Sequence, residues 1–127
     1  MRLVTFGCSI TYGQALTDNH PGNKFPSSYA WPQVLGNMTA LETVNLGRMG
    51  ASCKEIVNKV LEYNYQPDDV VIICWSYKER WCIIDENENI TRIGPWMWEN
   101  FRKPIANQIT NTANNYYDHL WNDYDSW

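Results

Sequence analysis

Closely spaced cysteines and long apolar runs are both missing from this 127-residue sequence. Its four cysteines form no C-x-x-C pair, so the sequence predicts neither a zinc ribbon nor a redox dithiol, and we expect no metal and no other cofactor. No stretch reaches the roughly 20 apolar residues of a membrane span, and the opening MRLVTFG lacks the apolar core of a signal peptide. We therefore expect cytoplasmic synthesis without membrane association, with release by lysis or a place in the virion if a phage encodes the chain.

A surplus of basic residues is also missing, because 10 Lys and Arg face 14 Asp and Glu and give a net charge of −4 at pH 7. This balance argues against nucleic acid as a partner. Aromatic residues, in contrast, are frequent, with seven Trp and eight Tyr. We expect most of them to pack in the core, while an exposed subset would suit a carbohydrate ligand.

Short apolar runs alternate with helical patterns along the first part of the chain, which predicts one domain over residues 1–127. Strands are predicted at residues 3–6, 41–45 and 70–76. The last run, VVIICWS, is continuous and β-branched, as in a parallel strand covered on both faces. The alternation predicts an α/β fold with a flavodoxin-like, three-layer, doubly wound parallel sheet, in which ligands meet the carboxyl ends of the strands.

Two helices are predicted between these strands. Ser27 or Ser28 is expected to cap the first helix, and Ser52 with Glu55 forms a capping box at the start of the second. The rest of the chain is expected to form a hairpin with a polar tip and then C-terminal helices, at residues 80–94 and 95–127.

Three segments at the predicted strand ends carry possible chemistry: GCSIT at 7–11, NLGRMGAS at 45–52 and VVIICWS at 70–76. They resemble the first three sequence blocks of the SGNH, or GDSL-like, hydrolase superfamily in a phage-type form, with Cys8 in place of the usual aspartate. The resemblance covers residues 1 to 80 and implies a carboxylic ester hydrolase whose nucleophile is Ser9. It also implies an oxyanion hole made by the backbone N–H groups of Ser9 and Gly50.

Two parts of the family pattern are absent from the sequence. The third oxyanion donor of the family, an asparagine, aligns with Tyr77, which leaves Tyr77 or Arg80 to donate. No D-x-x-H motif supplies a base, so the candidate bases are His20, in the first loop, and His119. Asp118 directly precedes His119, and adjacent side chains on a helix point about 100° apart, so this aspartate is not expected to orient the imidazole.

The arrangement around Ser9 can also be predicted. Alternation along the strand predicts that Cys8 packs beneath Ser9 as a buried thiol. Because the carboxyl ends of parallel strands share one edge of a sheet, we expect Ser9, Gly50 and the Ser76–Tyr77 segment to converge there. Both histidines are expected to lie too far from Ser9 to act.

Two functions follow from the resemblance. One is a serine esterase acting on O-acyl groups, such as O-acetyl groups of a carbohydrate, or on a small-molecule ester. The other is a non-catalytic SGNH-like binding module, or a phage structural or accessory protein. A nucleotide-binding flavodoxin-like domain is a third reading, but no glycine-rich phosphate loop follows the first strand.

In the family that the chain resembles, the fold continues with further strands and a late catalytic histidine. We therefore expect an incomplete domain that hydrolyses esters slowly or not at all by itself. The open edge beside the third strand would be covered by a second copy of the chain or by a partner chain.

Overall fold

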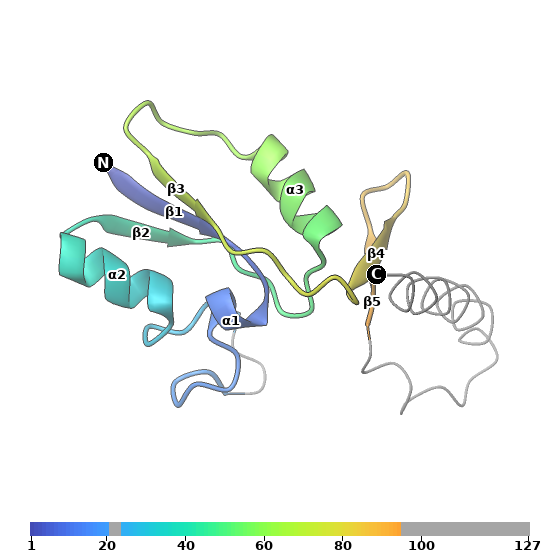
Figure 1. Ribbon diagram of the computed structural model, residues 1–127, viewed down its shortest axis with the longest axis horizontal. Helices are drawn as coiled ribbons and strands as arrows, with labels where there is room; N and C mark the ends of the chain where they lie inside the picture. Colours follow the sequence, from blue (N-terminus) through green and yellow to red (C-terminus); the bar gives the residue numbers. More distant parts are fainter. Residues whose placement is uncertain (21–23, 95–127) are drawn as a thin grey trace, which may run out of the picture. The chain divides into compact units, whose positions relative to one another are not determined.

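A parallel sheet of three strands, in the order β2-β1-β3, organises the computed structural model, which describes residues 1–20 and 24–94 (Figure 1). Its strands are β1 (Arg2–Phe6), β2 (Glu42–Asn45) and β3 (Val70–Ile73). A separate two-stranded sheet consists of β4 (Trp81–Ile84) and β5 (Ile90–Ile93). The prediction of a mixed α/β fold with a parallel sheet is therefore confirmed.

The chain divides into two compact units, Met1–Arg92 and Ile93–Trp127. The predicted C-terminal helices, at residues 95–127, lie outside the described residues, and one domain over the whole chain stays a prediction.

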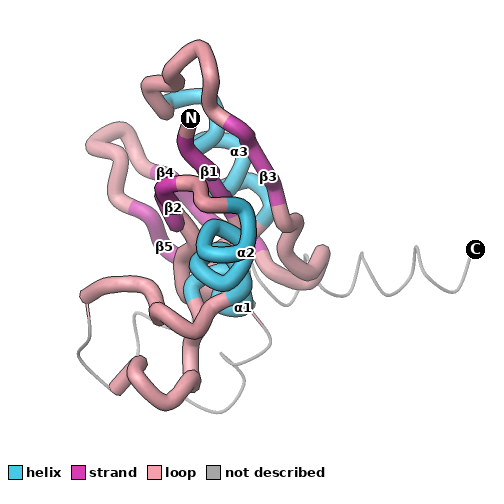
Figure 2. Tube along the Cα trace, turned by 90° about the vertical axis from the view of Figure 1, so that its left-hand side faces the viewer, coloured by secondary structure: helices cyan, strands magenta, loops and turns pink. Residues whose placement is uncertain are grey.

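The central strand is β1, and Figure 2 shows it between β2 and β3. Its register places Val4 beside Val44 of β2 and Val71 of β3. All four residues from Leu3 to Phe6 are buried, because both edges of β1 are paired and both of its faces are covered. The apolar run that predicted this strand therefore marks the true centre of the sheet.

The third predicted strand has a different position from the one its apolar run indicates. In the sheet formed by the described residues, β3 lies at an edge, and Val70 and Val71 are 41% and 40% exposed. The interpretation as a strand covered on both faces is thus wrong for its first half. The edge agrees with the expected opening beside the third strand, and its covering by another chain stays a prediction.

Helix α3 (Cys53–Glu62) follows its predicted start. Ser52 is the N-cap, and its hydroxyl accepts a hydrogen bond from the backbone N–H of Glu55 at 3.2 Å. The helix packs against β1, where Ile56 joins the apolar core with Val4 and Phe6. The capping box is confirmed.

Helix α2 (Trp31–Thr39) begins later than predicted, and neither expected serine caps it. Its N-cap is Ala30, whose side chain makes no capping hydrogen bond. Ser27 and Ser28 instead donate from their hydroxyl groups to the carboxylate of Asp18. The serines therefore fasten the loop before α2, where the Ser27 hydroxyl also accepts from the backbone N–H of Tyr29 at 3.0 Å.

The predicted hairpin is present as β4 and β5. Its polar tip is ordered by Asp85, whose carboxylate accepts from the backbone N–H groups of Asn87 and Asn89 at 2.8 and 2.9 Å. Among the described residues, no helix has the length and apolar character required to cross a membrane.

Candidate active site around Ser9

Ser9 lies immediately beyond the carboxyl end of β1. It is the first residue of the single-turn helix α1 (Ser9–Tyr12), after Cys8, which has an extended backbone. Gly7 makes the sharp change of direction possible, because a Cβ atom there would lie 2.1 Å from the side-chain oxygen of Thr11. Ser9 itself is partly exposed.

The loop after β2 holds α1 in place. The side chain of Asn45 donates to the carbonyl oxygen of Thr11 at 2.7 Å and accepts from the N–H of Gly47 at 2.9 Å. Gly47 touches α1 so closely that an added Cβ would lie 2.5 Å from the backbone nitrogen of Tyr12. Sequence reasoning assigned no role to Asn45, although an asparagine two residues before a glycine is a known signal for a side-chain-closed turn.

Gly50 lies in the same loop, beyond the carboxyl end of β2. Its φ of 74° is in the left-handed region that favours glycine, so the residue type is explained by backbone conformation. A glycine also lets a substrate approach the backbone without meeting a Cβ. The oxyanion role of the Gly50 N–H stays a prediction.

The segment after β3 brings a cation to Ser9. The Nη1 atom of Arg80 lies 3.5 Å from Ser9 Oγ. The guanidinium carbon of the same arginine lies 5.2 Å from the centre of the Tyr77 ring, which is itself 57% exposed. Of the two residues left open as a third donor, it is therefore Arg80 that reaches Ser9, while Tyr77 supports the arginine from its ring face.

Cys8 is buried beneath the site, as the alternation along β1 predicted, with 1% of its surface exposed. Burial raises the pKa of its thiol, but the Ile10 backbone N–H, the Ser76 hydroxyl and the charge of Arg80 together outweigh burial and lower that pKa. The Ser76 hydroxyl oxygen is buried. The surroundings of Cys8 thus favour negative charge next to Ser9.

Of the two candidate bases, His20 lies among the described residues. His20 is exposed on the loop after α1, and within residues 1–20 and 24–94 no hydrogen bond joins it to Ser9. His119 and Asp118 lie outside the described residues. The same range contains no group of three or more His, Cys, Asp or Glu side chains that could hold a metal ion.

A cavity of about 210 Å³ lies beside α3, away from the predicted site residues. Its lining residues are Phe6, Leu46, Arg48, Lys59, Glu62 and Tyr63. Ser9 is not among them.

Comparisons of the chain with protein-family models, with curated proteins and with solved structures found no match. The resemblance to SGNH hydrolases therefore depends on the three sequence segments. It is carried forward as a proposal, together with the geometry around Ser9.

Proposed function

We propose that the chain is a serine esterase of the SGNH-like type, with a flavodoxin-like three-layer fold, that hydrolyses O-acyl groups such as the O-acetyl groups of a carbohydrate. Ser9 Oγ attacks the ester carbonyl carbon, and the backbone N–H groups of Ser9 and Gly50 donate to the oxyanion. The observation that carries the proposal is the position of Ser9, a partly exposed residue just beyond the carboxyl end of the central strand, with Arg80 Nη1 at 3.5 Å from its Oγ.

Arg80 can stabilise the attacking serine oxygen, but it cannot act as the general base. A guanidinium donates only, so Ser9 Oγ accepts from Arg80 and keeps its own proton available for a base. The nearby positive charge also stabilises negative charge that develops on the serine oxygen. Arg80 cannot accept the proton, because a guanidinium is always charged in proteins. The base must therefore be another group, with His20 and His119 as candidates.

The atoms of the proposed reaction balance without a cofactor. The Ser9 Oγ–acyl bond forms as the bond between the acyl carbon and the alcohol oxygen breaks, and the serine proton passes through the base to the leaving alcohol. Water then attacks the acyl-enzyme and releases the acid.

Fluorophosphonate labelling followed by intact-mass and peptide analysis tests the proposal, since these reagents react with activated serines. We expect one adduct per chain on the peptide that contains Ser9, none in Ser9→Ala, and an unchanged adduct in the control Ser28→Ala, whose serine is exposed elsewhere. Labelling that survives Ser9→Ala would remove Ser9 from the mechanism. The variants His20→Gln and His119→Gln identify the base by the loss of labelling.

A non-catalytic SGNH-like binding module, phage structural or accessory protein is the second candidate. It is favoured by the chemistry of Arg80, which donates to Ser9 Oγ and cannot act as a base. This candidate predicts no stoichiometric labelling of Ser9 and no effect of either histidine variant.

A further inference from the structure

The cavity beside α3 has an apolar wall that contains two packed aromatic rings. Phe6, at the end of β1, and Tyr63, the C-cap residue of α3, pack edge to face, with ring centres 5.8 Å apart and planes at 84°. Tyr65 packs against Tyr63 in turn, with ring centres 5.0 Å apart. Leu46, directly after β2, is the third apolar side chain of the lining. Because neighbouring rings hold one another in place, the wall is largely formed before any ligand binds.

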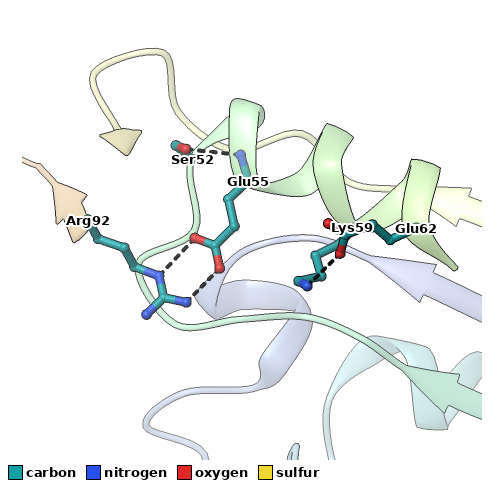
Figure 3. Close-up of polar contacts among 5 residues, drawn as sticks. All are labelled: Ser52, Glu55, Lys59, Glu62 and Arg92. Atoms are coloured by element: carbon teal, nitrogen blue, oxygen red, sulfur yellow. Dashed lines mark hydrogen bonds and ion pairs between the residues drawn. The ribbon is translucent and has the colours of Figure 1, made fainter. Parts of the chain in front are cut away.

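Charged side chains form the rest of the lining, and they are Arg48, Lys59 and Glu62. Lys59 and Glu62 pair with each other on α3 at 2.8 Å (Figure 3). Within residues 1–20 and 24–94, the Arg48 side chain makes no hydrogen bond or ion pair. Two cations and one carboxylate therefore leave a net positive charge beside the apolar wall, although the whole chain carries a net charge of −4.

The volume of the cavity limits the size of a ligand. At about 210 Å³ the cavity is smaller than the roughly 300 to 1,000 Å³ of pockets that take drug-sized ligands. It is larger than an apolar cavity of roughly 150 Å³, which is enough to hold benzene. A single ring with a short substituent therefore suits this cavity.

The charges of the lining favour a carboxylate as that substituent. A guanidinium has a planar fork of donors that matches the two oxygens of a carboxylate, and Arg48 brings such a fork to the cavity. Lys59 adds a second positive charge, and its exposed pair with Glu62 competes only weakly with a ligand. A cationic ring would instead be repelled by both Arg48 and Lys59.

We propose that this cavity is a binding site for a small aromatic carboxylate. The ring of the ligand packs against Phe6 and Tyr63, and its carboxylate accepts hydrogen bonds from Arg48, with Lys59 adding charge. The proposal does not depend on the esterase function, because Ser9 does not line the cavity.

Titration of the isotope-labelled full chain with phenylacetate, followed by amide NMR, tests the proposal. We expect saturable shifts at Phe6, Leu46 and Tyr63, which line the cavity. Phenylacetamide has a similar shape without the charge, and we expect it to bind about 10- to 100-fold more weakly, the effect of losing a hydrogen bond to a charged group. Acetate, which has the charge without the ring, should cause no saturable shift.

Three charge variants show which side chains recognise the carboxylate. Arg48→Gln should weaken binding of phenylacetate about 10- to 100-fold and leave binding of phenylacetamide unchanged. Glu62→Gln should strengthen binding of phenylacetate up to about fivefold, because it releases Lys59 from its pair and removes a repelling charge. The matched control Lys54→Gln removes a positive charge from an exposed residue of α3 that does not line the cavity, and it should leave both affinities unchanged.

Several results would overturn the proposal. Equal binding of phenylacetate and phenylacetamide, or equal binding of phenylacetate by the wild type and Arg48→Gln, would exclude carboxylate recognition. Absence of saturable shifts, or shifts only at residues outside the lining, would exclude the site. Cavity signals that change with protein concentration in the absence of ligand would show that a second copy of the chain covers the cavity instead. Labelling of Ser9 is measured separately, so this proposal and the proposed function stand or fail independently.

Discussion

The three-stranded sheet and the β4–β5 hairpin are held in place by different kinds of contact. Val4 and Phe6 of β1 pack in an apolar core with Ile56 of α3. The sheet is therefore stabilised by many weak, non-directional contacts. The hairpin reaches the same helix through Arg92, which donates to both carboxylate oxygens of Glu55 at 2.8 and 2.5 Å (Figure 3). The hairpin is therefore joined to α3 by a directional, charged pair, in addition to the packing contacts of β4 with the same helix.

This difference matters for the candidate site, because Arg80 directly precedes β4. The position of the hairpin helps to determine where the Arg80 guanidinium lies, whereas Ser9 is positioned by the sheet and by α1. Ser9 Oγ and Arg80 Nη1, which lie 3.5 Å apart, are therefore positioned by two different parts of the structure.

The largest effect is expected from Arg92→Met, which would break the attachment of the hairpin. Glu55 is only 1% exposed, so the change leaves a buried carboxylate without its partner. We expect the free energy of unfolding to fall by about 3 kcal/mol, measured by urea denaturation.

Two further variants show whether buried charge is the cause. Lys59→Met removes a cation from an exposed pair with Glu62 on the same helix, and we expect a change near the error of measurement. The double variant Glu55→Gln/Arg92→Met should be more stable than Arg92→Met alone, because no uncompensated charge stays buried. Equal stability of Arg92→Met and Lys59→Met would contradict the contrast between the hairpin and the sheet.

A smaller effect is expected on the sheet side from Gly47→Ala. The added Cβ would approach the backbone of α1 to 2.5 Å at Tyr12, and backbone cannot turn aside as a side chain can. We expect destabilisation of about 1 to 3 kcal/mol, with amide NMR shifts at Thr11 and Tyr12.

The matched control is Gly36→Ala, whose Cβ would meet the Thr43 side chain far from Ser9 in the sequence. It should destabilise the fold without moving the α1 amide signals. Shifts at α1 in both variants would show that Gly47 has no special role in positioning Ser9.

The smallest effect concerns the other bidentate pair, in which Arg2 of β1 donates to Asp69 just before β3 at 2.8 and 2.7 Å. The hydrogen bonds from Arg2 lower the pKa of Asp69. Its stabilising contribution is therefore complete above the ordinary aspartate pKa of about 3.9 and is lost as the pH falls through the lowered pKa.

Asp69→Asn should accordingly reduce the loss of thermal stability between pH 4 and pH 2, as followed by the midpoint of thermal unfolding. Asp68→Asn, at the exposed neighbouring position, should keep the acid dependence of the wild type. An identical acid profile for wild type and Asp69→Asn would show that this pair does not link β1 to β3 energetically.

Local patterns predicted much of the fold. The burial of β1, the capping box of α3 and the hairpin at residues 80–94 all follow from residues within a few positions of one another. Helix α2 was less predictable, because Ser27 and Ser28 hydrogen-bond to a carboxylate nine or more residues away, Asp18, and lie in the loop before the helix. The edge position of β3 was also missed, since an apolar run indicates burial but does not indicate which neighbours a strand has.

The sequence by itself determined the strands, the start of α3 and the place of Ser9 after the central strand, because these features depend on short-range periodicity and backbone chemistry. Only the tertiary structure decided which cation meets Ser9 and which carboxylate holds the hairpin. Arg80 and Ser9 are 71 residues apart, and Arg92 and Glu55 are 37 apart. Whether such distant residues meet depends on the order in which the strands pair and on the direction of each loop. Neither the strand order nor the loop direction can be predicted from the local spacing of residues along the chain.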